Sequence, residues 1–162
     1  MDDLKINHYL CRQNITLLMA KKTNIKNKSN KKPPTIQEAR RYVDNAQEIL
    51  KERGQLDDEG FEYQDEKYVR AAGNYLWLGV LMALDAVFHV REDRRTRVHI
   101  GDYYEVIAKR DGKLLDWVDS AYGIIHCYMN YDGNPSKALC DSGFQYANNI
   151  INRCATMVPL AK

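Results

Sequence analysis

The 162-residue sequence lacks the motifs that mark the commonest nucleotide, hydrolase and metal sites. Its nine glycines form neither a G-x-G-x-x-G fingerprint nor a P-loop, so no glycine-rich phosphate cradle is predicted. It contains no H-E-x-x-H and no G-x-S-x-G. No histidine follows a glutamate by three residues, which removes the Glu-x-x-His signature of di-iron carboxylate bundles. We therefore predict no metal ion, no cofactor and no nucleoside triphosphate chemistry.

Paired cysteines and long apolar runs are also missing. The cysteines show no C-x-x-C spacing and fall within apolar helical patterns, which favours buried reduced thiols over disulfides or metal ligands: Cys11, Cys127, Cys140 and Cys154. The longest apolar run, Tyr75 to Leu84, is about half of the roughly 20 residues that span a bilayer, and Asp85 ends it. The N-terminus lacks a signal-peptide pattern. These absences predict a cytoplasmic protein that does not enter a membrane.

Charge of one sign is not in large excess, since the net charge is only +2. The positive charge is unevenly placed, however, because residues 21–34 are rich in lysine and asparagine and end in two prolines. This composition is too polar for a core, so we predict that residues 1–34 are an N-terminal extension and flexible linker. A solvated tail is favoured, and a nucleic-acid arm is the alternative. Residues 1–18 are expected to contribute nothing to the fold.

No stretch alternates at the period of two that a half-buried strand requires, so we predict an all-α fold. Residues 35–158 are expected to form a single domain, an antiparallel bundle of four to five helices. One helix opens at Thr35 with a capping box and ends at Gly54. The other helical regions are 65–90, then 102–129 with a break at Asp111 and Gly112, and finally 136–155.

The stretch from Asp65 to Val90 is expected to be the central helix of this bundle. It is apolar almost all round, and a helix without a polar face has to be enclosed by others. Small residues recur along it, which allows neighbouring backbones to approach closely: Ala71, Ala72, Gly73, Gly79, Ala83 and Ala86. We expect the rest of the chain to wrap around it.

A first group of candidate functional residues is polar and lies in the predicted interior. Asp85 and His89 are one turn apart on the central helix, with Asn74 three turns before Asp85. Tyr122 and His126 are one turn apart on a later helix that could face them. These five residues are our predicted ligand pocket.

Two interpretations of this group remain open. Burying an unpaired carboxylate costs several kcal/mol, so Asp85 needs a partner, a proton or a cavity, and Arg41 and Arg70 are candidate partners. The group could form a small pocket with acid/base capacity. The favoured alternative is a satisfied hydrogen-bond network that fixes the register of the helices.

A second group lies in the charged connector 91–99. Here Arg94 precedes His99 by five residues among further arginines. An arginine can hold a phosphodiester and a neighbouring histidine can move a proton, so Arg94 and His99 would suit metal-free RNA cleavage. The alternative is an ordinary solvated loop whose arginines are partly neutralised by Glu92 and Asp93.

The segment from Ala71 to Val87, followed by a charged connector that ends in His99, resembles the HEPN superfamily (higher eukaryotes and prokaryotes nucleotide-binding). The similarity covers residues 35–155 and extends to small bacterial helical proteins. It implies a four- or five-helix bundle that is often a homodimer. Some such proteins are ribonucleases with an Arg-x(4–6)-His motif, matched here by Arg94 and His99 alone, and others are inactive partners of minimal nucleotidyltransferases. In the family the catalytic pair usually lies near the last helix, whereas here it precedes the third helical region.

Together these observations favour a binding or assembly module that acts as a homodimer. RNA or a nucleotidyltransferase-type protein is the partner that the resemblance implies. The alternatives are a metal-independent endoribonuclease that uses Arg94 and His99, and a small-ligand-binding bundle with the predicted polar pocket.

Overall fold

The computed structural model describes residues 34–91 and 98–158. The predictions for the N-terminal extension, for Cys11 and for Arg94 lie outside these described residues. The described residues form five α-helices and one π-helix: α2 (Ile36–Arg53), α3 (Glu66–Phe88), α4 (Ile100–Ala108), α5 (Gly112–Ala121), η1 (Tyr122–Asp132) and α6 (Lys137–Met157). They contain no β-strand, only two isolated bridges, so the predicted all-α class is confirmed.

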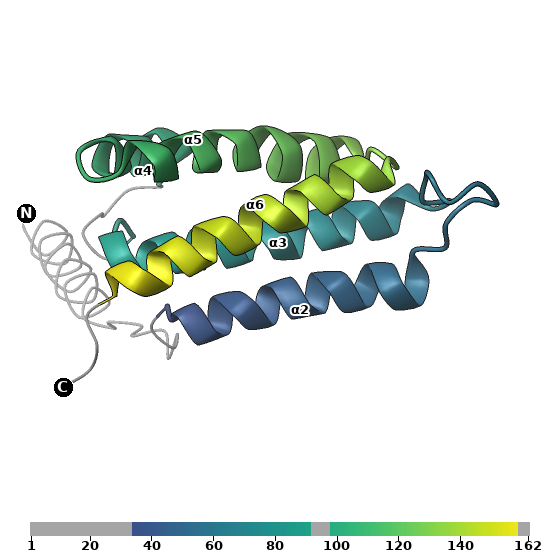
Figure 1. The fold of residues 1–162 in the computed structure, drawn as a ribbon, viewed down its shortest axis with the longest axis horizontal. Helices are drawn as coiled ribbons and strands as arrows, with labels where there is room; N and C mark the ends of the chain where they lie inside the picture. Colours follow the sequence, from purple (N-terminus) through teal and green to yellow (C-terminus); the bar gives the residue numbers. More distant parts are fainter. Residues whose placement is uncertain (1–33, 92–97, 159–162) are drawn as a thin grey trace, which may run out of the picture. The chain divides into compact units, whose positions relative to one another are not determined.

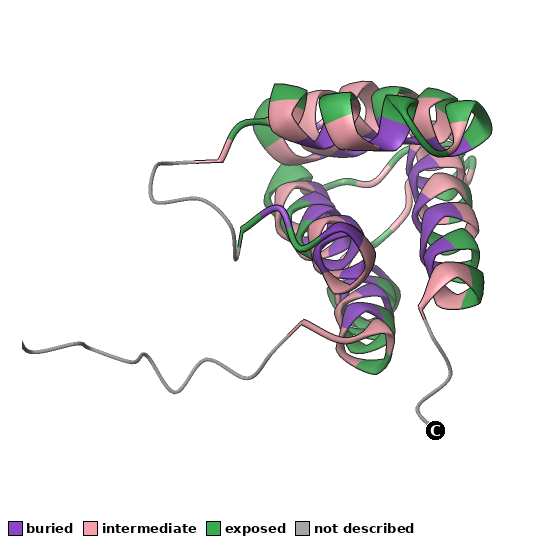
Figure 2. Cartoon of the chain, turned by 90° about the vertical axis from the view of Figure 1, so that its left-hand side faces the viewer, coloured by how far each residue is buried: buried purple, intermediate pink, exposed green. Residues whose placement is uncertain are grey.

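Successive long segments of the bundle run in opposite directions, as Figure 1 shows for α2, α3, the continuous α5–η1 segment and α6. The short α4 precedes α5 in the same layer. Buried residues lie on the inward sides of the helices (Figure 2). This arrangement is the predicted bundle of four to five helices.

The predicted helix starts are confirmed by side-chain caps. Thr35 Oγ1 accepts a hydrogen bond from the Glu38 N–H at 3.1 Å. Asp65 caps α3, Asp111 caps α5 at the predicted break, and Ser136 caps α6. Each cap satisfies an N–H group that a helix start leaves without an intrahelical partner.

The central helix α3 is less enclosed than predicted. Eleven of its 23 residues are buried, while Asn74 is exposed and Leu78 keeps 36% of its surface accessible. By length and composition α3 could cross a membrane, yet 56% of its most apolar window is buried inside the bundle, as in the core helix of a soluble domain. The apolar pattern therefore predicted the core position of α3 correctly and the closure around it only in part.

Small residues of α3 allow close approach of its neighbours, as predicted. A Cβ added to Gly73 would lie 2.6 Å from the backbone N of Asn130 in η1. A Cβ added to Gly79 would lie 3.0 Å from the backbone O of Ala39 in α2. The tighter of the two contacts joins α3 to the π-helix.

The π-helix η1 is a feature that the sequence analysis did not predict. It spans eleven residues, continues directly from α5 and ends at Gly133, which adopts the left-handed conformation (φ 70°). The Gly133 N–H donates to the Met129 carbonyl oxygen at 3.1 Å. π-Helical turns are rare and often occur at functional sites, so η1 directs attention to the residues it carries.

The three described cysteines are free thiols. Cys140 and Cys154 are buried, and burial raises the pKa of each to about 12. Cys127 is half-buried. The prediction of unpaired thiols is confirmed for these three residues.

Candidate functional site

A cavity of about 350 Å³ lies between α3, α4 and η1. We call it the α3–α4–η1 cavity. Its walls combine aromatic and aliphatic side chains with a few polar groups: Trp77, Leu81, Arg91, Val98, His99, Ile100, Tyr103, Tyr122 and His126. Apolar walls with a small number of placed polar groups are typical of small-molecule sites.

Helical spacing explains the contribution of α3. Trp77, Leu81 and Asp85 follow one another at intervals of four residues, so they share one face of the helix. Trp77 and Leu81 line the cavity directly. Asp85 lies one turn further along and is 3% exposed.

Asp85 is held by partners from two other segments. The Tyr103 hydroxyl in α4 donates to Asp85 Oδ1 at 2.8 Å. Arg91 Nε, in the segment after α3, lies 2.9 Å from Asp85 Oδ2 and 3.2 Å from the Tyr103 oxygen. Burial and the hydrogen bond to the Asp85 carboxylate raise the pKa of Tyr103, so its hydroxyl remains a donor. The carboxylate thus positions both Arg91 and Tyr103 beside the cavity.

Three of the lining residues, Trp77, Tyr122 and His126, form an aromatic cluster. The centroid of the His126 ring lies 5.3 Å from that of Trp77 and 5.2 Å from that of Tyr122. Trp77 and Tyr122 meet edge to face at 5.7 Å. Within this cluster His126 Nδ1 is buried and has no hydrogen-bond partner. A buried polar atom without a partner is costly, and this one belongs to a ring that lines the cavity.

His99 stands at the edge of the same cavity. It is the N-cap of α4, and its backbone N–H donates to the Asp102 carboxylate at 2.8 Å. The residue is exposed and lines the cavity. The side chain of Arg91 is 42% exposed, so the cavity reaches solvent at these two residues.

The predicted ligand pocket is assembled in part. Tyr122 and His126 line the cavity, and Asp85 lies behind Arg91 and Tyr103. Asn74 and His89 do not belong to it, since both are exposed and absent from its walls. His89 instead ends α3 in the left-handed conformation (φ 53°).

The predicted arginine partners of Asp85 were wrong. Arg41 pairs with Glu38 at 2.8 Å. Arg70 binds the backbone oxygens of Tyr131 and Asp132 at the end of η1. The described arginine that pairs with Asp85 is Arg91, which lies six residues after Asp85 and beyond the end of α3.

Three lining residues were missed as site residues: Trp77, Arg91 and Tyr103. Trp77 was assigned to the core, where it also belongs, since it is 7% exposed. The four-residue spacing of Trp77, Leu81 and Asp85 could have placed the tryptophan beside the carboxylate. Tyr103 could be recognised as a site residue only from the packing of α4 against α3, which brings its hydroxyl to Asp85.

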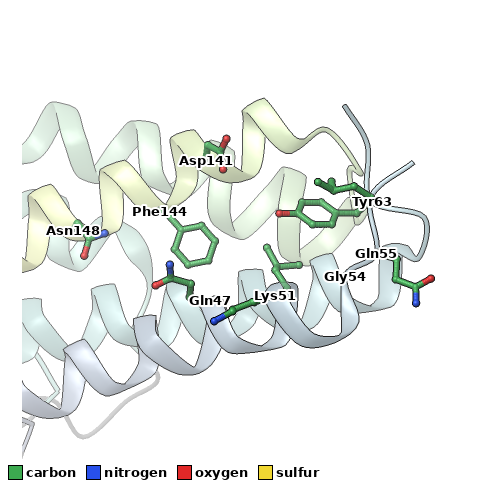
Figure 3. Close-up of a pocket in the computed structure, with 10 residues that line it drawn as sticks. Gln47, Lys51, Gly54, Gln55, Tyr63, Asp141, Phe144 and Asn148 are labelled. Carbon is green, nitrogen blue, oxygen red and sulfur yellow. The ribbon is translucent and has the colours of Figure 1, made fainter. Parts of the chain in front are cut away.

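A second hollow lies between α2 and α6 and measures about 580 Å³. We call it the α2–α6 groove. Figure 3 shows the rings of Phe144 and Tyr63 between the two helices. Its polar lining side chains are exposed: Gln47, Lys51, Gln55, Asp141 and Asn148. The groove is larger but is lined by groups that water already solvates.

Within residues 34–91 and 98–158, no three histidine, cysteine or carboxylate side chains are grouped closely enough to hold a metal ion. The α3–α4–η1 cavity has two histidines in its walls and no carboxylate. Its chemistry is therefore that of hydrogen bonding, ring stacking and a guanidinium charge.

Comparison with known proteins places the chain among proteins without an assigned activity. A family model described as "Domain of unknown function (DUF5618)" matches residues 34–156. A solved structure described as a protein of unknown function from Dyadobacter fermentans is 36% identical, with a TM-score of 0.67. The similarity covers 75% of this chain and 92% of that one. No curated protein matches the chain.

Proposed function

Since the chain belongs to the DUF5618 family, we propose that this domain is a binding module that holds a small planar molecule in the α3–α4–η1 cavity. The ring of the ligand would lie against Trp77 and His126. A polar atom at the edge of the ligand would pair with His126 Nδ1. Tyr122 completes the aromatic wall, and Asp85 holds Arg91 and Tyr103 in place from behind.

The observation that carries this proposal is the unpaired, buried Nδ1 of His126 beside an open cavity. A nitrogen in this position lowers the stability of the protein unless something binds it. The His126 ring packs against the rings of Trp77 and Tyr122, which restrain its orientation. Both features are typical of a binding site and are not required by a packed core.

The test is a nuclear magnetic resonance screen of the full-length protein with a library of aromatic fragments. The two tryptophans give two indole N–H signals, and a Trp117→Phe variant assigns them. We expect some fragments to shift the signals of Trp77 and His126 but not that of Trp117. If no fragment shifts them at about 1 mM, a concentration that detects interactions of only ~4 kcal/mol, the proposal is wrong.

An endoribonuclease is the second candidate, favoured by the exposure of His99 at the edge of the cavity near Arg91. It would use His99 as acid/base and Arg94 to hold phosphate, as the resemblance to HEPN ribonucleases implies. The test is cleavage of a mixed RNA pool in EDTA by the wild type and by His99→Ala. Cleavage that disappears in the variant would support this candidate, and no cleavage by the wild type would eliminate it.

We also propose that the domain is cytoplasmic and assembles as a homodimer. Exposed aromatic residues support the assembly, since Phe61 is 69% and Tyr131 78% exposed. Phe61 lies in the α2–α3 loop and Tyr131 in the last turn of η1. Backbone hydrogen bonds join that loop to the segment after η1, from the Lys137 N–H to the Phe61 oxygen and from the Tyr63 N–H to the Pro135 oxygen. In analytical ultracentrifugation the wild type should sediment as a dimer and Phe61→Ser/Tyr131→Ser as a monomer. Leu78→Ser, an exposed apolar residue in α3, is the control and should leave the dimer intact.

A further inference from the structure

We infer that the ligand of the α3–α4–η1 cavity is an aromatic carboxylate, with its ring against Trp77 and His126 and its carboxylate on Arg91. This inference rests on the proposed function and adds the charged group that the ligand must carry. It depends on which part of the Arg91 guanidinium is already occupied, on the charge of the site and on its size.

Arg91 uses one edge of its guanidinium inside the protein. Nε forms an ion pair with Asp85 Oδ2 at 2.9 Å and donates a hydrogen bond to the Tyr103 oxygen at 3.2 Å. Among the described residues, the two terminal nitrogens of Arg91 have no hydrogen-bond partner. The end of a guanidinium presents two parallel N–H groups that match the two oxygens of a carboxylate. The part of Arg91 left for a ligand is therefore a carboxylate-binding fork.

Asp85 fixes this fork in orientation. The carboxylate is almost fully buried, and Tyr103, which is 2% exposed, holds it from α4. An arginine restrained in this way loses less side-chain entropy on binding than a free surface arginine. Arg91 is therefore prepared for a ligand in a way that the exposed arginines of α2 are not.

The charge of the site favours a monoanion. The positive charge of Arg91 is balanced by Asp85, and among the described residues no lysine or second arginine lines the cavity. A carboxylate adds one negative charge, which the fork can hold by two charge-assisted hydrogen bonds. A dianionic phosphate would need more positive charge than these walls supply.

The size of the cavity limits the rest of the molecule. A volume of about 350 Å³ lies near the lower end of the roughly 300–1,000 Å³ of ligand sites. One ring or two fused rings with a carboxylate suit this volume. The stacked side chains of Trp77 and His126 provide a face for such a ring.

The test compares naphthoate with naphthamide, which has the same rings and no charge, by isothermal titration calorimetry on the full-length protein. We expect the wild type to bind the acid about tenfold or more tightly than the amide, as two charge-assisted hydrogen bonds imply. Arg91→Gln should abolish this preference, which is measured as the ratio of the affinities for the acid and the amide in the same variant. Arg91→Lys, which keeps the charge but loses the fork, should retain only part of it.

Arg40→Gln is the matched control, because Arg40 is an exposed arginine of α2 that bonds Asn152 and does not line the cavity. It should leave both affinities unchanged. Equal binding of acid and amide by the wild type would overturn the inference and leave the proposed function standing. A preference for the acid that survives Arg91→Gln would also overturn it. If neither compound binds, the inference is wrong, and the fragment screen described above tests the proposed function separately.

Discussion

The α2–α6 groove and the α3–α4–η1 cavity differ in how far water already solvates their polar groups. The α2–α6 groove is the larger, about 580 Å³ against about 350 Å³, but its polar side chains are exposed and solvated. The α3–α4–η1 cavity is smaller. The buried Asp85 carboxylate lies behind its lining residues Arg91 and Tyr103, and the buried Nδ1 of its lining residue His126 has no hydrogen-bond partner among the described residues. Burying polar groups costs stability, so the smaller hollow has a cost that the larger one lacks. A site is better identified by this cost than by its volume.

The largest expected difference concerns the acidic residues of the two regions. Asp85→Asn should lower the free energy of unfolding by about 2 to 4 kcal/mol, because it removes the charge that Arg91 and the Tyr103 hydroxyl pair with in a buried position. Asp141→Asn in the groove should have a much smaller effect, because Asp141 pairs with Lys137 at the surface. Urea unfolding monitored by circular dichroism measures both. Equal losses for the two variants would contradict the contrast.

A smaller effect is expected from the packing of α3 against its two neighbours. Gly73→Ala places a Cβ 2.6 Å from the backbone of η1 and should cost about 1 to 3 kcal/mol. Gly79→Ala faces α2 at 3.0 Å and should cost less, since the clash is milder and alanine favours the helix by up to ~1 kcal/mol. Thermal unfolding of the two variants gives the comparison. A larger loss at Gly79 would show that the contact of α3 with α2 is the tighter one.

As the pH rises, stability should be lost first beside the groove and then beside the cavity. Burial raises the pKa of the Cys140 thiol, beside the groove, from 9.0 to about 12, and raises that of Tyr103, beside the cavity, from its usual 10.0. In both cases the unfolded chain loses its proton first, so stability present below the unfolded pKa is lost as the pH rises. The free energy of unfolding should therefore fall above pH 9 and more steeply above pH 10. Cys140→Ala should remove only part of the earlier decline, because burial raises the pKa of the Cys154 thiol equally. Tyr103→Phe should remove part of the later decline, to which the raised pKa of Tyr104 also contributes.

The sequence predicted the frame of the fold better than the site. Caps and apolar spacing are local signals, and they located the starts of α2, α3, α5 and α6 correctly. Tyr122 and His126 were predicted as pocket residues because a four-residue spacing on one helix can be read directly. Asn74 was predicted by the same kind of spacing and was wrong as a pocket residue, because the sequence does not show which face of α3 is covered.

The remaining features depend on contacts between distant segments. The link between Asp85 and Tyr103 requires knowing that α4 packs against the end of α3. Arg91 becomes the partner because the chain turns after His89, which no apolar pattern indicates. The composition of residues 122–132 does not indicate that this segment, which carries Tyr122 and His126, forms a π-helix.

The smallest expected change in stability comes from the most direct test of the central claim. The claim is that the buried nitrogen of His126 serves ligand binding and is not needed for folding. His126→Phe keeps an aromatic ring against Trp77 and Tyr122 and removes the unpaired nitrogen. We predict that the free energy of unfolding stays unchanged or rises by up to about 1 kcal/mol, while fragment binding at Trp77 is lost. A fall of about 2 kcal/mol or more would mean that the histidine is needed for the fold itself, and it would contradict the assignment of this cavity as a binding site.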